Sequence, residues 1–309
     1  MSALTRRELL RGLGAGAPLA VSATAEDAQA SAMDTVQPAK NAVAMLFDTT
    51  RCIGCQACVA ACAEANGLVP DTLLSGGLHQ TPLDLNSHTK NIIKLYQDPD
   101  GTSSFVKRQC MHCLDPACVA GCPFGALKKG DRGVVTWNAS QCIGCRYCEV
   151  ACPFEVPKFE WDMFNPKIVK CEFCREQRLD QGQEPACTAA CPTDAVVFGL
   201  RSDLLADAHA RIAQKPNTYA EGRVYGETEA GGTQVLYLSH MPFEKLGLPT
   251  LSPEARPGRE LRFQMIVYKW LLFPLTLFAL IAGVIRRRWR DHDEEVKALE
   301  TKEGLKEQL

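Results

Sequence analysis

Apolar residues occur along the chain in short runs separated by polar segments that contain proline and glycine. Several runs are rich in β-branched and aromatic residues and predict strands: Ala44–Phe47, Asn91–Tyr96, Phe105–Lys107, Val134–Trp137, Val196–Phe198 and Val235–Leu238. A helical pattern begins near Ser202, a candidate N-terminal cap, and ends at about Gln214, before Pro216. The pattern predicts an α+β fold with short elements and a thin apolar core.

One apolar stretch near the C-terminus is much longer than the others. Between Met265 and Ile285 the only charged residue is Lys269. A helix of this length spans about 32 Å, close to the ~30 Å hydrocarbon core of a bilayer. We therefore predict a linker over 251–262, a transmembrane helix over 263–286 in which Lys269 reaches the headgroups, and a tail over 287–309. A buried core helix is the alternative, and the arginines that follow Ile285 argue against it.

The sixteen cysteines fall into four groups of four with none left over. The first and third groups have the spacing C-x2-C-x2-C-x3-C, by which bacterial ferredoxins hold cubane clusters, with three thiolates on one cluster and the fourth on another. Sixteen thiolates at four per cubane predict four [4Fe–4S] clusters. The groups are Cys52, Cys55, Cys58, Cys62; Cys110, Cys113, Cys118, Cys122; Cys142, Cys145, Cys148, Cys152; and Cys171, Cys174, Cys187, Cys191.

Disulfides and zinc also use closely spaced cysteines. A disulfide framework does not need this repeated spacing, and thiols two residues apart are poorly placed to bridge. Zinc sites use two C-x2-C pairs and leave no role for a third cysteine three residues further on. Iron–sulfur clusters are therefore the favoured interpretation.

The cysteine groups form an internal repeat. Cys52-Ile53-Gly54-Cys55 recurs as Cys142-Ile143-Gly144-Cys145, and the glycines suit a backbone with positive φ or a close approach to sulfur. A proline follows the last cysteine of every group except the first. The first group has Ala63 at this position, so we expect the backbone after Cys62 to follow a different path from that after the other groups. Spacing alone leaves open which groups share clusters, because similar gaps separate the second group from the third and the third from the fourth.

Residues 1–30 have the features of an export signal. Arg6-Arg7 precedes a glycine-rich apolar stretch too short to anchor in a membrane, and Ala28-Gln29-Ala30 matches a cleavage site. A twin-arginine signal is favoured over an ordinary secretory one, because that route exports proteins already folded around cofactors. The main domain is then periplasmic, on the face of the inner membrane, with a single-pass helix and a cytoplasmic C-terminus.

The net charge of −2 gives no indication of a nucleic-acid partner. Four clusters add roughly −8 of buried charge, and basic residues lie close to the cysteines in the sequence. They either offset that charge or form a solvated face: Lys107, Arg108, Lys128, Lys129, Arg146, Lys158, Lys167 and Lys170. His112, between two ligands, could tune a cluster, but a partly exposed packing role is favoured. Ordinary packing is also favoured for Tyr147 and Trp161.

The four-group layout resembles the ferredoxin-like subunits of membrane-bound respiratory oxidoreductases, over about Leu46 to Ile285. It is most similar to the HybA-type subunits of periplasm-facing nickel–iron hydrogenases, and next to the β subunits of membrane-bound formate dehydrogenases. The resemblance rests on Cys110-Met111-His112-Cys113, on the third cysteine group, on Gly231-Gly232-Thr233-Gln234-Val235, on the chain's own signal peptide and on its single C-terminal helix. The separate signal peptide favours the hydrogenase relative.

The resemblance implies two bacterial-ferredoxin-like 2[4Fe–4S] domains with short β additions: an outer domain over 40–105 and 160–250, and an inner domain over 106–159. It also implies a nested sharing of ligands. The expected ligand sets are Cys52, Cys55, Cys58, Cys191 for cluster 1; Cys171, Cys174, Cys187, Cys62 for cluster 2; Cys110, Cys113, Cys118, Cys152 for cluster 3; and Cys142, Cys145, Cys148, Cys122 for cluster 4.

The resemblance further implies a non-catalytic subunit that relays electrons from the small and large subunits of a hydrogenase to a quinone-reactive membrane subunit. The sequence has no haem C-x2-C-H motif, no nucleotide-binding glycine motif and no nucleophile constellation. A formate dehydrogenase or related molybdenum complex is the alternative setting. A structural or sensing cluster protein that passes no current is the alternative function.

Overall fold

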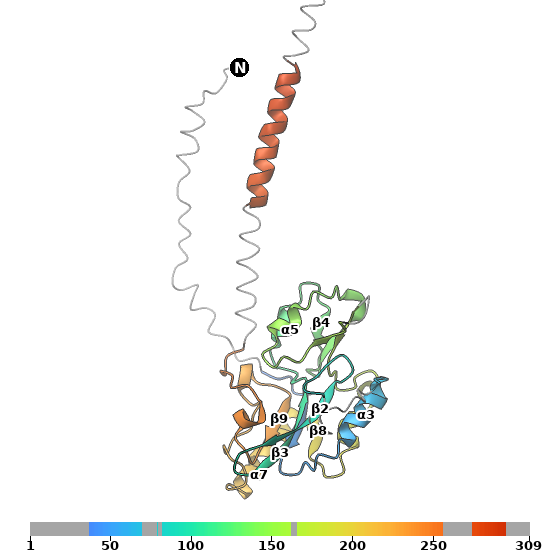
Figure 1. Ribbon diagram of the computed structural model, residues 1–309, viewed down its shortest axis with the longest axis vertical. Helices are drawn as coiled ribbons and strands as arrows, with labels where there is room; N and C mark the ends of the chain where they lie inside the picture. Colours follow the sequence, from blue (N-terminus) through green and yellow to red (C-terminus); the bar gives the residue numbers. More distant parts are fainter. Residues whose placement is uncertain (1–36, 70–78, 80–81, 162–165, 256–273, 295–309) are drawn as a thin grey trace, which may run out of the picture. The chain divides into compact units, whose positions relative to one another are not determined.

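The computed structural model describes residues 37–69, 79, 82–161, 166–255 and 274–294 (Figure 1). The predicted export signal over 1–30 lies outside these residues, as do Lys269, the part of the predicted transmembrane helix before residue 274, and the tail beyond residue 294.

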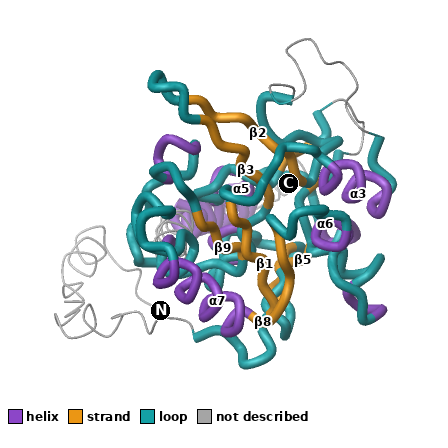
Figure 2. The backbone as a smooth tube through the Cα atoms, turned by 90° about the horizontal axis from the view of Figure 1, so that it is seen from below, coloured by secondary structure: helices purple, strands orange, loops and turns teal. Residues whose placement is uncertain are grey.

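A three-stranded sheet joins segments that are far apart in the sequence (Figure 2). Its central strand β1, Val43–Asp48, runs antiparallel to β8, Val196–Leu200, and parallel to β9, Val235–Leu238. The sheet therefore fixes the start of the described chain beside the segments that follow the fourth cysteine group.

Strand β1 is buried at every position because both of its faces are covered. Ala44 and Leu46 pack with Leu204 and Ala208 of helix α7, Arg201–Gln214. The alternate residues of β1 point to the opposite face. There Met45 and Phe47 belong to a core that includes cysteines of the first and fourth groups.

Three antiparallel hairpins complete the strands. They pair β2, Asn91–Gln97, with β3, Ser103–Gln109; β4, Leu127–Lys129, with β5, Val135–Trp137; and β6, Lys158–Phe159, with β7, Ile168–Val169.

Short helices follow the cysteine loops and pack in pairs. Helix α3, Ala57–Asn66, contacts α6, Ala186–Ala189, whereas α4, Ala117–Ala120, contacts α5, Tyr147–Ala151. The first cysteine group thus lies with the fourth, and the second with the third. Single 3₁₀ turns occur at Ala139–Gln141, Leu179–Gln181, Glu229–Gly231 and Phe243–Leu246.

All six predicted strands and the predicted helix are present, with small shifts at their ends. The prediction that Ser202 caps α7 is wrong. The helix begins at Arg201, after Leu200, which makes no side-chain cap bond, and the Ser202 hydroxyl hydrogen-bonds Asp203 instead.

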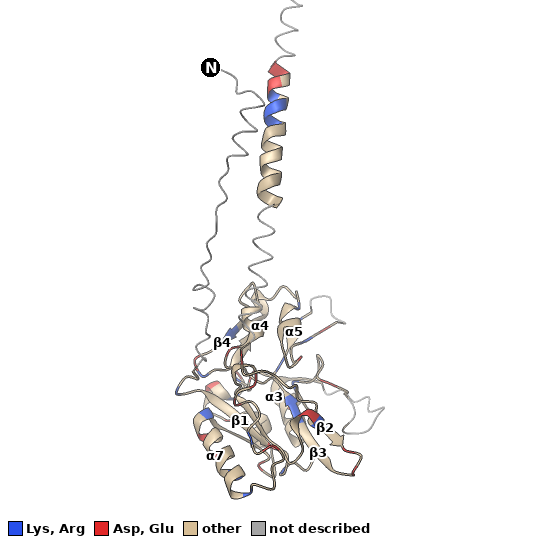
Figure 3. Ribbon diagram, turned by 90° about the vertical axis from the view of Figure 1, so that its left-hand side faces the viewer, with Lys and Arg blue, Asp and Glu red and all other residues tan. Residues whose placement is uncertain are grey.

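Residues 274–294 form a helix whose side chains are exposed. Figure 3 shows an uncharged stretch followed by a band of arginines and an acidic end, which matches residues 286–290 and the segment after them. Within the described ranges, no helix is both long enough and apolar enough to cross a bilayer.

Candidate iron–sulfur sites

Four cysteines predicted to share a cluster, Cys52, Cys55, Cys58 and Cys191, line a single cavity. We call them quartet 1. The first three come from the loop before α3 and its first turn, and the fourth follows α6, so the α3–α6 contact brings them together. The cavity walls are otherwise largely apolar and include Phe47, Ile93 and Val196.

Gly54 allows the first loop to fold against the hairpin. Its φ is +69°, and a Cβ at this position would lie 2.5 Å from the ring of Phe105. Both observations disfavour a side chain at this position, and of the two roles predicted for this glycine the positive φ is confirmed. The approaching group is an aromatic ring of β3, however, and not a sulfur atom.

The corresponding set at the other end of the repeat is quartet 4: Cys122, Cys142, Cys145 and Cys148. These four also line one cavity, together with apolar residues such as Phe124, Leu127 and Ile168. Gly144 repeats the conformation of Gly54 with a φ of +71°. Quartet 4 is therefore built like quartet 1, with α4 and α5 in place of α6 and α3.

Quartet 2 consists of Cys62, Cys171, Cys174 and Cys187, and all four are buried. The pKa of Cys62 is raised to about 11, first by burial and, against the opposing charge of Lys107, by the neighbouring Cys187 and Cys174. The mutual electrostatic influence of these thiols shows that they are neighbours in the fold.

Quartet 3 consists of Cys110, Cys113, Cys118 and Cys152. Burial raises the pKa of Cys113 well above its usual value, and Cys152, Cys118 and Cys110 add to the shift in that order. The thiols of quartets 1 and 4 thus share cavities, whereas those of quartets 2 and 3 are electrostatic neighbours.

Backbone N–H groups point at the last sulfur of three cysteine groups. The amide of Ala126 donates to Cys122 Sγ at 3.3 Å, and that of Ala195 donates to Cys191 Sγ at 3.2 Å. Burial raises the pKa of Cys152 to about 11, and hydrogen bonds from the Val156 amide and its neighbours oppose that increase. In each case the donor lies four residues beyond the cysteine, after the turn that the intervening proline begins.

The first group lacks this proline and uses a side chain in place of the amide. Helix α3 continues past Cys62 to Asn66, so the Asn66 amide nitrogen, four residues on, serves as the donor. It donates to the carbonyl oxygen of Cys62 at 2.8 Å and also lies 3.6 Å from Cys62 Sγ and 3.8 Å from Cys174 Sγ, while Lys90 donates to its side-chain oxygen at 2.9 Å. The prediction from Ala63 that the backbone takes a different path after the first group is confirmed, but the role of Asn66 was not predicted.

These donor sets fit iron–sulfur clusters. The described chain contains sixteen free cysteines. Burial raises the pKa of Cys58 and of Cys148 to about 12, so these thiols stay protonated near neutral pH unless a cationic core stabilises their thiolates. N–H···S bonds and apolar walls are the usual surroundings of such clusters. No group of three or more His, Cys, Asp and Glu among the described residues converges closely enough to hold a single metal ion.

Electrostatic influence between thiols links the quartets in the order 1, 2, 3, 4. After burial itself and the opposing charge of Lys107, the pKa of Cys58 in quartet 1 is raised by Cys187 of quartet 2. The smaller causes that raise the pKa of Cys171 include Cys110 of quartet 3, and those that raise that of Cys118 include Cys148 of quartet 4. Each quartet is thus an electrostatic neighbour of the next.

Of the basic residues noted in the sequence, two are buried and several, including Lys129, are half-buried. Lys107 and Lys170 are buried, with exposed fractions of 1% and 3%. Lys129 is half-buried and donates to the carbonyls of Cys113 and Leu114 at 2.7 and 2.6 Å. The interpretation of a solvated face is therefore wrong for the two buried lysines, whose ammonium groups lie inside the fold beside the thiols.

Two aromatic side chains differ from the favoured sequence interpretation. His112 has no exposed surface at all, so the prediction of a partly exposed histidine is wrong. Its ring packs 3.9 Å from the ring of Phe173, measured between centroids. Trp161 is 70% exposed and stacks under the guanidinium of Arg146 at 4.1 Å, so it is a surface residue and not a packed one.

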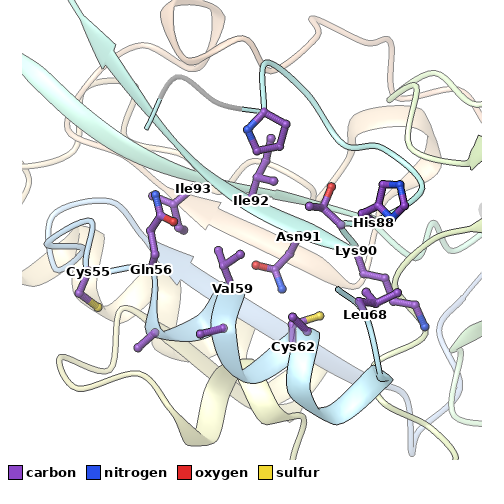
Figure 4. Close-up of a pocket in the computed structure, with 15 residues that line it drawn as sticks. Cys55, Gln56, Val59, Cys62, Leu68, His88, Lys90, Asn91, Ile92 and Ile93 are labelled. Carbon is purple, nitrogen blue, oxygen red and sulfur yellow. The ribbon is translucent and has the colours of Figure 1, made fainter. Parts of the chain in front are cut away.

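A cavity of about 280 Å³ lies between α3 and β2. Figure 4 shows Asn91 reaching from β2 towards α3, between Val59 and Cys62. The Asn91 amide nitrogen lies 3.4 Å from the carbonyl oxygen of Cys58. Cys55 and Cys62 both line the cavity, so it belongs to the surroundings of quartets 1 and 2.

Comparison with known proteins agrees with this geometry. Two models described as 4Fe–4S dicluster domains match residues 44–123 and 102–201. The chain is 35% identical over 325 residues to the "Hydrogenase-2 operon protein HybA" of Escherichia coli O157:H7, covering 94% of this chain and 98% of that protein. It is 36% identical over 210 residues to the "Formate dehydrogenase, nitrate-inducible, iron-sulfur subunit" of E. coli K12, covering 66% of this chain and 70% of that subunit.

The fold and the thiol quartets define an electron-transfer protein with ferredoxin-like 4Fe–4S dicluster domains. Within that class, the extent of the match shows that the chain belongs to the HybA family of hydrogenase iron–sulfur subunits.

Proposed function

We propose that the chain holds four [4Fe–4S] clusters, one in each quartet, and relays electrons between a hydrogenase catalytic module and a quinone-reactive membrane subunit. When bound, each cluster accepts and releases one electron. The observation that carries the proposal is the pattern of exposure along the row. The two exposed cysteines, Cys55 and Cys145, belong to quartets 1 and 4, whereas quartet 2 is buried throughout. A relay needs accessible ends and an insulated middle.

The surroundings of the two end quartets support contact with partner proteins. Ile53 beside quartet 1 is 59% exposed and Ile143 beside quartet 4 is 63% exposed. The Ile143 side also presents Val150 and Trp161, which are 81% and 70% exposed. Exposed apolar residues next to a redox ligand are typical of docking surfaces. We assign these two surfaces to the partner that delivers electrons and the partner that accepts them.

A hydrogenase complex is favoured over a formate dehydrogenase complex. The similarity to the HybA protein covers nearly the whole of both chains, whereas the similarity to the formate dehydrogenase subunit covers about two thirds of this chain. The proposed partners are therefore the small and large subunits of a nickel–iron hydrogenase, together with an integral membrane subunit.

We further propose that the main domain faces the periplasm and that residues 263–286 cross the inner membrane. The described part of this segment supports membrane insertion, because its leucine, isoleucine, valine and phenylalanine side chains are exposed. The arginines at 286–290 would then stop the helix on the cytoplasmic side. Residues 1–30 would act as the twin-arginine export signal.

The test uses the complex purified anaerobically from its native membrane. We expect nickel and iron to copurify with the chain, and hydrogen to reduce quinone. Replacing the exposed ligand in Cys145→Ser should abolish that electron flow while hydrogen oxidation with a soluble dye continues. Quinone reduction at the wild-type rate in this variant contradicts the relay, and molybdenum without nickel contradicts the hydrogenase assignment.

A further inference from the structure

His112 is a ligand-loop residue with a buried ring nitrogen, Nε2, that has no hydrogen-bond partner in the described chain. It lies between Cys110 and Cys113 with a φ of +48°, and its side chain is fully buried. A non-glycine residue in this left-handed conformation is uncommon. The imidazole lies inside the protein, against the ring of Phe173.

One hydrogen bond fixes the tautomer of this imidazole. The backbone N–H of Val135, on β5, donates to His112 Nδ1 at 3.0 Å. A backbone amide can only donate, so Nδ1 must carry the lone pair. The ring proton is therefore on Nε2.

The Nε2–H group has no acceptor among the described residues, although it is buried. Buried donors in folded proteins nearly always have an acceptor. The two neighbouring lysines cannot serve, because ammonium groups only donate and both are already used. Lys170 donates to the carbonyls of Val135 and Cys171, and Lys129 donates to those of Cys113 and Leu114.

The ring belongs to the loop of quartet 3 and packs against a residue of the loop of quartet 2. The cysteines on either side of His112 in the chain belong to quartet 3. Phe173, which stacks on the ring, lies between two ligands of quartet 2, and its backbone amide donates to Cys171 Sγ at 3.4 Å. Sulfur atoms of an iron–sulfur cluster are hydrogen-bond acceptors, and such bonds adjust the potential of the cluster.

We propose that His112 Nε2–H donates a hydrogen bond to a sulfur atom of an inner cluster, either that of quartet 3, whose ligands flank it, or that of quartet 2, across Phe173. His112 is thus a positioning residue that favours the reduced, more negative cluster. The inference rests on the proposed assignment of clusters to the quartets.

The first experiment compares redox titrations of the iron-loaded complex, followed by electron paramagnetic resonance, before and after His112→Leu. We expect one inner cluster to become about tenfold harder to reduce, a shift of about 59 mV to lower potential. Cys113→Ser and Cys174→Ser mark the signals of quartets 3 and 2 and identify the cluster that shifts. His240→Leu is the control, because both ring nitrogens of His240 have protein partners, Thr49 and Ser103.

The second experiment needs no variant that must fold. In wild-type protein carrying ¹⁵N-labelled histidine, pulsed resonance should detect one histidine nitrogen coupled to a reduced inner cluster, with an exchangeable proton. The absence of this coupling, or unchanged inner potentials in an iron-replete His112→Leu variant, overturns the inference and leaves the relay standing. Failure to bind iron in the wild type contradicts the proposed function itself.

Discussion

Lys107 is the residue whose replacement should change the redox properties most without removing a thiol. It lies on β3 opposite Ile93 of β2, and Ile93 lines the cavity of quartet 1. Directly opposed residues of an antiparallel pair point to the same face. The ammonium donates to the side chain of Gln109 and forms no ion pair with a carboxylate in the described part of the chain.

The charges around Lys107 come from two quartets. Burial on its own lowers the pKa of Lys107, but Cys187 of quartet 2 and Cys58 of quartet 1 raise it above the usual 10.5. The lysine therefore stays charged when those thiolates are present. With a cluster in each of these quartets, one cation near both would make both easier to reduce.

A simple estimate gives the size of the effect. A unit charge at roughly 8 Å, with an effective dielectric constant of about 20, contributes ~2 kcal/mol. For one electron this corresponds to ~90 mV, since a tenfold change is 59 mV. We expect Lys107→Met, which keeps the length of the side chain, to lower the potentials of clusters 1 and 2 by about this amount. Clusters 3 and 4 should keep theirs.

The assay is a redox titration of the anaerobically purified complex, with iron content measured in parallel. Lys94→Met is the matched control, because Lys94 follows Ile93 on β2 and points to the other face. Unchanged potentials in an iron-replete Lys107→Met variant, or an equal decrease in all four clusters, would refute the electrostatic reasoning.

Two further outcomes follow from the geometry of the loops and the burial of the thiols. Gly54→Ala should destabilise the protein by ~3 kcal/mol, because of the positive φ and the clash with Phe105. The control Gly182→Ala, at a φ of +76° with nothing within 4 Å, should destabilise it by only ~1 kcal/mol through backbone strain. Equal losses of stability for the two variants in thermal melts would contradict this reasoning. Because burial raises the pKa of Cys58 and of Cys148 to about 12, protons compete with iron at neutral pH, so iron retention against a chelator should increase from pH 6.5 to 9. Retention that does not depend on pH would contradict the assigned thiol chemistry.

The sequence was sufficient for the features that depend on local spacing. Runs of β-branched residues identified the strands, and the cysteine spacing identified the four groups, whereas the nested sets of thiols came from the family resemblance. Strand β4 was missed because Leu127–Lys129 contains two lysines and has no apolar alternation. This strand forms because its backbone pairs with β5, which its own sequence pattern does not predict.

The parts that could not be predicted depend on contacts between distant segments. Nothing near His112 in the sequence shows that the amide of Val135 will approach its ring. The role of Asn66 depends on Cys174, more than a hundred residues away. The sequence did contain one signal for this role of Asn66. The first group lacks the proline of the others, and Asn66 occupies the position four residues beyond Cys62 where the other groups present a backbone amide.

The most direct test of the central claim is an iron and acid-labile sulfide analysis of the anaerobically isolated chain, combined with Mössbauer spectroscopy. Four cubanes predict about sixteen iron and sixteen sulfide ions per polypeptide, all in [4Fe–4S] form. Far fewer iron ions per chain, or zinc in their place, would contradict the account.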